Sequence, residues 1–358
     1  MASGEASVSS ITTFDERSQI GNLTGAESSP LVPDADFWYP DGTVVLLART
    51  KVAFRVHKGI LADHSTVFCD LFAVAQPQGE ERYAECPTVN LTDAPGEVKY
   101  LLKVLYRPRR YYMPDQRVSF AMVAALLRLG HKYAIDDFVS STLSRLATCF
   151  SSSFETYYAS ITTEGSPDMT CIPEDAITAV NLARLVGEDA SMILPSALYT
   201  CCQLPSSTLT RGVISEDGDV QKLSDADLDL CIDARVRLSA LALASAVQRC
   251  QFRSDQPNDQ GTEREGSARC MQAFCAPYLA AAASRVLAGT LGLPNPTGAL
   301  DSLDWFVADS TRGGLLCRVC AESIREKDKE ERLRIWKMLP RILGLQVKEW
   351  STADQRKI

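Results

Sequence analysis

The sequence has no long apolar run and no strong positive charge, and each shortage excludes a class of protein. The most apolar stretch, residues 238–247, is far shorter than the roughly 18 residues that a membrane-spanning helix needs. The opening MASGEASVSS has neither a basic segment nor an apolar core, so no secretory signal is expected. A net charge of −8 disfavours a nucleic-acid partner. We therefore expect an intracellular protein, in the cytoplasm or the nucleus, without a membrane partner.

Recognisable catalytic motifs are also missing. The chain has no Gly-Lys pair, which excludes a P-loop, and it contains neither G-x-G-x-x-G nor G-x-S-x-G. Its three histidines, His57, His64 and His131, all precede residue 150, so a Cys–His pair would have to join distant parts of the chain. We interpret His57 as a polar residue that bonds the backbone at a strand-to-helix junction. The sequence predicts no enzyme and no cofactor.

The twelve cysteines are too sparse for a disulfide-built scaffold, and most stand alone in apolar patterns. Two pairs differ, Cys270-x4-Cys275 and Cys317-x2-Cys320. Each pair could supply two thiolates from one local turn, so these four residues are candidate zinc ligands. Cysteines at such spacings on a helix also share its core-facing side, and this second interpretation stays open.

Changes in composition divide the chain into three parts. Residues 1–33 are rich in Ser, Thr, Gly and Glu and predict a disordered tail. Residues 34–150 form the first ordered block, and residues 151–358 predict an α-helical region. Within this region, the polar stretch 253–267 lacks large apolar residues and predicts a loop.

The first ordered block mixes short strands with amphipathic helices. Apolar runs at 43–47 and 52–56, separated by a few residues, predict a β-hairpin. Residues 58–72 predict two short helices or one bent helix, with Ser65 well placed as an N-cap for the second half. A third strand and three further helices are expected over 87–91, 95–106, 118–129 and 135–150, with Gly130 separating the last two helices.

The segment Phe54–Phe68, FRVHKGILADHSTVF, resembles the F-x-x-H-K-x-x-L-A-x-x-S-x-x-F signature of BTB/POZ domains. Val89–Leu91, Leu105–Tyr106 and Leu126–Tyr133 match further landmarks of that family in order. The resemblance covers about residues 34–150. It implies an α+β fold with a small mixed sheet and clustered helices, followed here by a mainly helical region.

The later part of the chain resembles the helical region that follows BTB domains in a large group of fungal proteins. The segments that carry this resemblance are Val180–Arg184, Leu194–Tyr199 and Ile335–Pro340. No activity is assigned to that region.

BTB domains are interaction modules and not enzymes, so the resemblance implies protein partners, with a homodimer or an adaptor role. Family dimers form through the N-terminal segment and first helix, which makes Phe37, Trp38, Tyr39, Lys58, Leu61 and Phe68 the candidate interface residues. Dimerising members often place an Asp in the first strand close to a basic residue after the histidine. Lys58 matches the basic position, but Thr43 occupies the acidic one and Asp41 lies two residues earlier. Dimerisation therefore stays open.

A basic loop is the remaining feature of this block. Arg107, Arg109 and Arg110 alternate with aromatic residues, a pattern that suits an acidic peptide, a nucleic acid or simply a solvated loop. Family members that recruit a cullin scaffold often carry an apolar-x-Glu motif here, whereas residues 107–117 contain no glutamate.

Taken with the missing catalytic motifs, these features predict a non-enzymatic interaction and assembly protein, with a helical region whose ligand is unknown. One alternative is a substrate adaptor of a cullin-type ubiquitin ligase. Another is a nuclear transcription-associated factor, although the chain has no motif that reads DNA bases.

Overall fold

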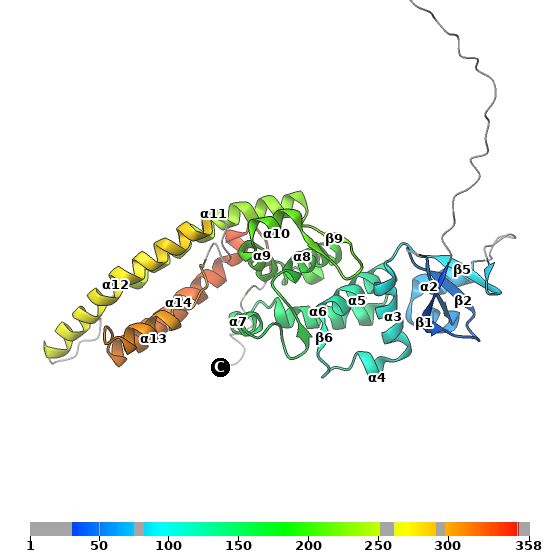
Figure 1. The fold of residues 1–358 in the computed structure, drawn as a ribbon, viewed down its shortest axis with the longest axis horizontal. Coiled ribbons are helices and arrows are strands. Elements are labelled where there is room, and N and C mark those ends of the chain that lie inside the picture. Colours follow the sequence, from blue (N-terminus) through cyan, green and yellow to red (C-terminus); the bar gives the residue numbers. More distant parts are fainter. Residues whose placement is uncertain are drawn as a thin grey trace, which may run out of the picture.

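The computed structural model describes residues 31–49, 51–74, 82–250, 261–290, 298–348 and 350. The molecule is elongated, with a mixed sheet at one end and long helices toward the other (Figure 1). Within these ranges, no helix combines the length and the apolar composition that crossing a bilayer requires.

The sheet has five strands in the order β1-β3-β2-β5-β4. Their bounds are β1 Val32–Trp38, β2 Val44–Leu47, β3 Val52–Val56, β4 Arg82–Tyr83 and β5 Cys86–Asn90. β2 and β3 are antiparallel, with Val44 opposite Val56, which confirms the predicted hairpin. β5 is parallel to β2 and β1 is parallel to β3, so the sheet is mixed, as the predicted fold class requires.

Strand β1 begins inside the segment predicted to be a disordered tail, so that prediction is wrong at Val32 and Pro33. The strand carries two aspartates, and it contains a proline, which a sheet tolerates at its edge but not in its centre. β1 is indeed an edge strand, and its register with β3 shifts between Pro33 and Trp38. Residues 1–30 lie outside the described ranges.

The helices of this first block surround the sheet. They are α1 Lys58–His64, α2 Thr66–Ala73, α3 Pro95–Tyr106, α4 Pro108–Tyr111, α5 Phe120–Lys132 and α6 Asp136–Cys149. The Ser65 hydroxyl accepts a hydrogen bond from the Phe68 amide at 3.1 Å, which confirms the predicted N-cap. The same hydroxyl donates to the Tyr133 carbonyl at 2.6 Å. This bond ties the junction between α1 and α2 to the end of α5.

The break predicted at Gly130 is wrong, because α5 continues through this residue to Lys132. The chain turns at Ala134 instead, where φ is 50°. A Cβ atom on Gly130 would lie 3.1 Å from the Cβ atom of Phe138 in α6. The glycine therefore allows α5 and α6 to approach each other closely, and it does not mark the end of a helix.

The chain beyond residue 150 is mainly helical, as predicted. Its first elements are α7 Phe154–Thr162, α8 Asp175–Val186, the 3-10 turn η1 Glu188–Ala190, α9 Leu194–Gln203 and α10 Ser206–Arg211, with the short strands β7 Met169–Thr170, β8 Val213–Ile214 and β9 Val220–Gln221. Another short strand, β6 Val118–Ser119, lies before this boundary, ahead of α5. We call the remaining long helices the helical arm: α11 Asp225–Cys250, α12 Gly261–Thr290, α13 Asp304–Arg312 and α14 Arg318–Ile342. In Figure 1 the arm extends away from the sheet.

Helix α12 corrects the polar loop that was predicted at 253–267. The helix begins at Gly261, so the prediction is wrong from that residue onward. The segment 262–269 contains Glu, Arg and Ala, which have favourable helix propensities although they contribute no large apolar side chain. Residues 251–260 lie outside the described ranges.

A single hydrophobic core crosses the boundary drawn at residue 150. It joins Leu127 of α5 to Val180 of α8 and Trp336 of α14, all of them buried. β6 and β7 also pair across this boundary, parallel to each other. The elements around α8 therefore pack directly onto α5 and α6.

Candidate functional site

Three of the predicted interface residues belong to the chain's own core. Phe37, Leu61 and Phe68 are each no more than 1% exposed. They pack with the apolar side chains of β2, β3 and α3. Phe37 is buried within its own domain because the pairing of β1 with β3 incorporates this residue into the sheet.

The two neighbouring aromatic residues are half-buried. Tyr39 stacks on Tyr106, with ring centroids 5.1 Å apart and 13° between the planes. Trp38 meets Tyr83 edge-on at 5.9 Å. Both rings are thus partly occupied by contacts within the same domain.

The outward side of α2 carries an apolar stripe that sequence analysis missed. Val67, Leu71 and Val74 are 41%, 37% and 66% exposed. Val67 and Leu71 are four residues apart on one side of the helix, and Val74 is its C-cap residue. Phe68 and Phe72 face the core from the adjacent side. The sequence of α2 contains more apolar residues than a single core-facing stripe requires. This excess of apolar residues was the signal that some of them are exposed.

The start of α1 shows how this chain departs from the family's acid–base pair. The Thr43 hydroxyl accepts a hydrogen bond from the backbone amide of Lys58 at 2.9 Å. Asp41 instead lies 3.4 Å from Nε2 of His57, whose Nδ1 is 3.1 Å from the Tyr106 hydroxyl. The interpretation that His57 bonds the backbone through its ring is therefore wrong. The reason is that the end of α3 brings Tyr106, whose pKa is raised by burial, against the imidazole.

The basic loop does not gather its three arginines. The Arg107 guanidinium lies 5.7 Å from the centre of the Phe37 ring, and its Nη2 atom is 3.5 Å from the Tyr39 hydroxyl. Arg109 and Arg110 are exposed on α4. Only these two residues are available as a basic surface for a partner.

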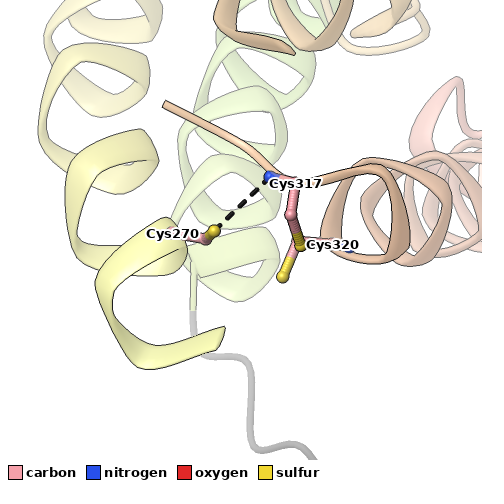
Figure 2. Close-up of side chains that lie close together, drawn as sticks. All are labelled: Cys270, Cys317 and Cys320. Atoms are coloured by element: carbon pink, nitrogen blue, oxygen red, sulfur yellow. Dashed lines mark hydrogen bonds between the residues drawn. The ribbon is translucent and has the colours of Figure 1, made fainter. Parts of the chain in front are cut away.

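In the helical arm, three of the four candidate zinc ligands converge. The Sγ atoms of Cys270, Cys317 and Cys320 all lie within 4.8 Å of one another. Cys270 comes from α12, whereas Cys317 is the N-cap of α14 and Cys320 lies in its first turn (Figure 2). The Cys317 amide donates to the Cys270 sulfur at 3.4 Å, and the Cys320 amide donates to the Cys317 sulfur at 3.5 Å.

Cys275 does not join this cluster, so the predicted four-thiolate set is wrong in one member. Its thiol donates to the carbonyl of Cys250 in α11 at 3.7 Å. Five residues along a helix correspond to a rotation of about 140° beyond one full turn, so Cys270 and Cys275 face different neighbours. Cys250 is half-buried beside Cys275, and burial raises the pKa of the Cys250 thiol to about 12.

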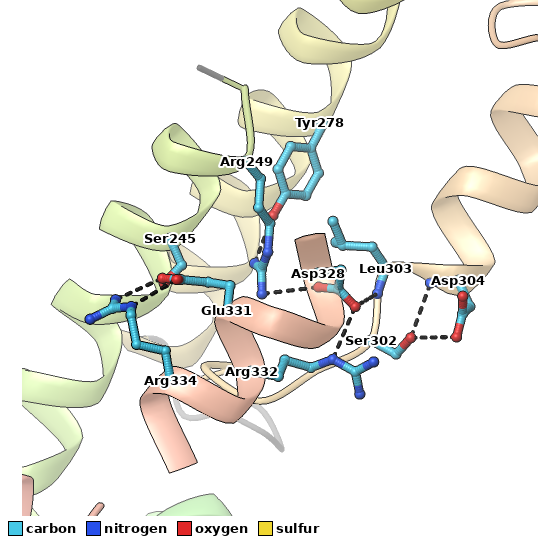
Figure 3. Close-up of polar contacts among 10 residues, drawn as sticks. All are labelled: Ser245, Arg249, Tyr278, Ser302, Leu303, Asp304, Asp328, Glu331, Arg332 and Arg334. Carbon is cyan, nitrogen blue, oxygen red and sulfur yellow. Dashed lines mark hydrogen bonds and ion pairs between the residues drawn. The ribbon is translucent and has the colours of Figure 1, made fainter. Parts of the chain in front are cut away.

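A buried charge network lies further along α14 (Figure 3). Asp328 is 2% exposed and forms ion pairs with Arg249 of α11 at 3.0 Å and with Arg332 at 2.9 Å. The Arg249 guanidinium also donates to the Tyr278 hydroxyl of α12 at 3.1 Å, and the Leu303 amide donates to Asp328 at 3.3 Å. These contacts join α11, α12 and α14 to the segment that leads into α13.

A second acidic group of α14 lies at the border of this network. Glu331 accepts hydrogen bonds from the Ser245 hydroxyl at 2.6 Å and from Arg334 at 2.7 Å. The bond from Arg334 is the main cause of the lowered pKa of Glu331. Burial raises the pKa of Asp328, although both of its arginine partners oppose that rise.

The comparison with known families identifies one part of the chain. A family model for the BTB/POZ domain matches residues 41–148. A comparison with curated proteins finds no match. The BTB/POZ domain is a protein–protein interaction module and does not belong to an enzymatic family. The α2 stripe lies within the matched range, whereas the cysteine cluster and the buried charge network lie outside it.

Proposed function

We propose that this chain, in which residues 41–148 form a BTB/POZ domain, is a non-enzymatic assembly protein that self-associates through α2. The observation that carries the proposal is the exposed stripe of Val67, Leu71 and Val74 on a domain whose general role is protein interaction. Covering apolar surface contributes about 25 cal/mol per Å². A second copy related by a two-fold axis would present the same stripe and cover both.

The proposal revises which residues of the domain meet a partner. Phe37, Leu61 and Phe68 support the domain from inside, and the contact falls to the outward residues of α2. Lys58 is half-buried, and its ammonium lies 5.4 Å from the centre of the Phe72 ring, next to this surface. The pair between Lys58 and an acidic residue of the first strand has no part in this arrangement.

Light scattering on the full chain tests the proposal. The wild type should be a dimer, and the double variant Val67→Glu/Leu71→Glu should be a monomer with unchanged circular dichroism. Val236→Glu is the matched control, because Val236 is also an exposed apolar residue on a helix, at 70% exposure on α11. A wild type that is monomeric at tens of micromolar contradicts self-association, and a dimeric double variant contradicts the choice of α2.

We further propose that residues 1–31, which precede β1, form a tail ahead of the assembly domain and that the helical region, residues 151–358, binds the protein partner. The resemblance of this helical region to the fungal helical regions supports a common domain order, in which an assembly domain is followed by partner-binding helices. The protein would act inside the cell, in the cytoplasm or the nucleus.

The two alternatives predict different results. A ubiquitin-ligase adaptor should retain a cullin scaffold in a pull-down. If substitutions in loop 107–117 abolished that binding, the adaptor role would replace the assembly proposal. A transcription-associated factor should be enriched in the nucleus and bind DNA directly. The loop without glutamate and the charge of −8 favour neither of these outcomes.

A further inference from the structure

We propose that Cys270, Cys317 and Cys320 bind one Zn²⁺ ion through three thiolates, leaving the fourth tetrahedral position to a ligand from solvent. Zn²⁺ replaces the three thiol protons, so no oxidant or reductant is involved. The site would lie in the helical arm, outside the BTB/POZ match, and it is independent of self-association through α2.

The spacing of the three sulfurs suits this ion. Zinc–sulfur bonds of about 2.3 Å in a tetrahedral site place the sulfurs about 3.8 Å from one another. The three Sγ atoms already lie within 4.8 Å of one another. Movements of about 1 Å or less, within the reach of side-chain rotation, would therefore complete the coordination.

The local electrostatics favour thiolates over thiols. Two backbone amides, those of Cys317 and Cys320, already point at sulfur atoms of the cluster. Cys317 occupies the N-cap of α14, where the partial positive charge of the helix end stabilises an anion. Hydrogen bonds from backbone amides to sulfur also tune the electronic properties of metal-bound thiolates.

Burial distinguishes the cluster from ordinary core cysteines. Cys201, Cys202 and Cys231 are completely buried. Burial raises the pKa of Cys201 well above its usual value, and a hydrogen bond with Cys231, followed by burial, does the same for the pKa of Cys202. By contrast, Cys317 is exposed and Cys270 is half-buried. The cluster therefore opens to solvent, which gives an ion a route to it and leaves room for a fourth ligand.

A bound ion would fix the register of α12 against α14. Cys317 and Cys320 begin α14, and Asp328 lies eight residues after Cys320, about 12 Å along a helix. Asp328 reaches Arg249, which in turn donates to Tyr278 of α12. The zinc site and the charge network would thus connect the same two helices at two separated levels.

Metal titration of the reduced, chelator-treated and tag-free full chain tests the proposal. Zn²⁺ in competition with a chromophoric chelator should bind at one equivalent, protect three thiols from alkylation and raise the melting temperature. Co²⁺ should give the thiolate charge-transfer band and the visible bands of a tetrahedral site. Adding imidazole should shift the visible bands if the fourth position is open.

Single substitutions distinguish the proposed zinc ligands from the nearby cysteine Cys275. Loss of a partner outside the first coordination sphere typically weakens binding 10–100-fold, so Cys317→Ser and Cys270→Ser should each weaken Zn²⁺ binding by more than about 100-fold. Cys275→Ser is the matched control, and it should leave the affinity unchanged. Circular dichroism of each metal-free variant shows whether it folds like the wild type.

Three outcomes would overturn the proposal. They are no stoichiometric binding by the reduced wild type, equal loss of binding in Cys275→Ser and Cys317→Ser, and retained binding in the double variant Cys270→Ser/Cys317→Ser. The oligomeric state measured in the same samples reports separately on α2.

Discussion

The BTB/POZ domain and the helical arm have different interiors. In the domain, the side chains between sheet and helices are aromatic and aliphatic, with Phe37, Phe54 and Phe68 fully buried. In the arm, a smaller apolar cluster lies beside Arg249, Asp328 and Arg332, which are no more than 8% exposed. The domain also buries the charged side chains of Asp93 and Arg145. Asp93 pairs with the partly exposed ammonium of Lys132, and Arg145 donates to backbone carbonyls. In the arm, by contrast, a buried carboxylate lies between two buried guanidinium groups.

The difference suggests what each interior specifies. Burial of apolar surface stabilises many alternative packings, and shape selects among them. A buried charge is costly unless its partners lie in one arrangement. The triad of Arg249, Asp328 and Arg332 therefore raises the free energy of any other register of α11 against α14. We expect the arm to be sensitive to the loss of one charge and the domain to be sensitive to the loss of one ring.

The largest effect is expected from Asp328→Asn, which keeps the volume and removes the charge between Arg249 and Arg332. Breaking a buried pair by removing one partner typically costs about 3–5 kcal/mol. Chemical denaturation should show this loss in the free energy of unfolding. Hydrogen exchange should become faster in α11–α14 and stay unchanged in β2 and β3.

The matched control is Asp233→Asn, because Asp233 pairs with Arg237 at 3.7 Å on the exposed side of α11. An exposed pair of this kind contributes about 0.5 kcal/mol or less. Equal losses in the two variants would show that the triad has no special role, and the contrast between the two interiors would fail.

The corresponding substitution in the domain is Phe37→Ala. Truncating a fully buried phenylalanine typically costs about 3–5 kcal/mol. The exchange of amides in β1 and β3 should accelerate while the arm stays protected. Val32→Ala, on the same strand but 55% exposed, should change the free energy of unfolding by about 0.5 kcal/mol or less. If Phe37→Ala instead left a fully stable monomer, Phe37 would be an interface residue after all.

The domain was predictable from the sequence because its signals are local. A continuous apolar run identifies β2, alternating apolar and polar residues identify β3, and a serine followed by a helical pattern identifies the start of α2. Edge strand β1 escaped prediction because it is formed by pairing with β3 and because a proline and two aspartates interrupt its apolar residues. The helix break predicted at Gly130 was wrong because, in a sequence, a glycine required by close packing cannot be distinguished from one that ends a helix.

The arm was predictable only as helices. The charged pattern around residues 325–334 correctly indicates a helix, but sequence alone does not say which charges face inward. Asp328 and Arg332 are four residues apart on the same side as Ile324 and Ile335, and this coincidence was the available signal. Likewise, the Cys-x2-Cys pair was visible, whereas the choice of Cys270 over Cys275 depends on how α12 is rotated against α14.

The smallest effect compares two serine N-caps, one in the domain and one at α7, which lies between the domain and the arm. Ser65 is 2% exposed, accepts from the Phe68 amide and donates to the Tyr133 carbonyl. Ser153, at the start of α7, is half-buried and accepts from the Thr156 amide at 3.5 Å.

Ser65→Ala removes both bonds and leaves a buried carbonyl without its donor, so it should lower the free energy of unfolding by about 2 kcal/mol. Ser153→Ala should cost about 0.5 kcal/mol, the low end for a cap. Thermal and chemical denaturation of the two variants measure the difference. Similar losses would mean that the bond to Tyr133 adds nothing to the cap. A larger loss for Ser65→Ala would show that a single hydroxyl couples the junction of α1 and α2 to α5, and that the apolar interior of the domain also depends on a directional bond.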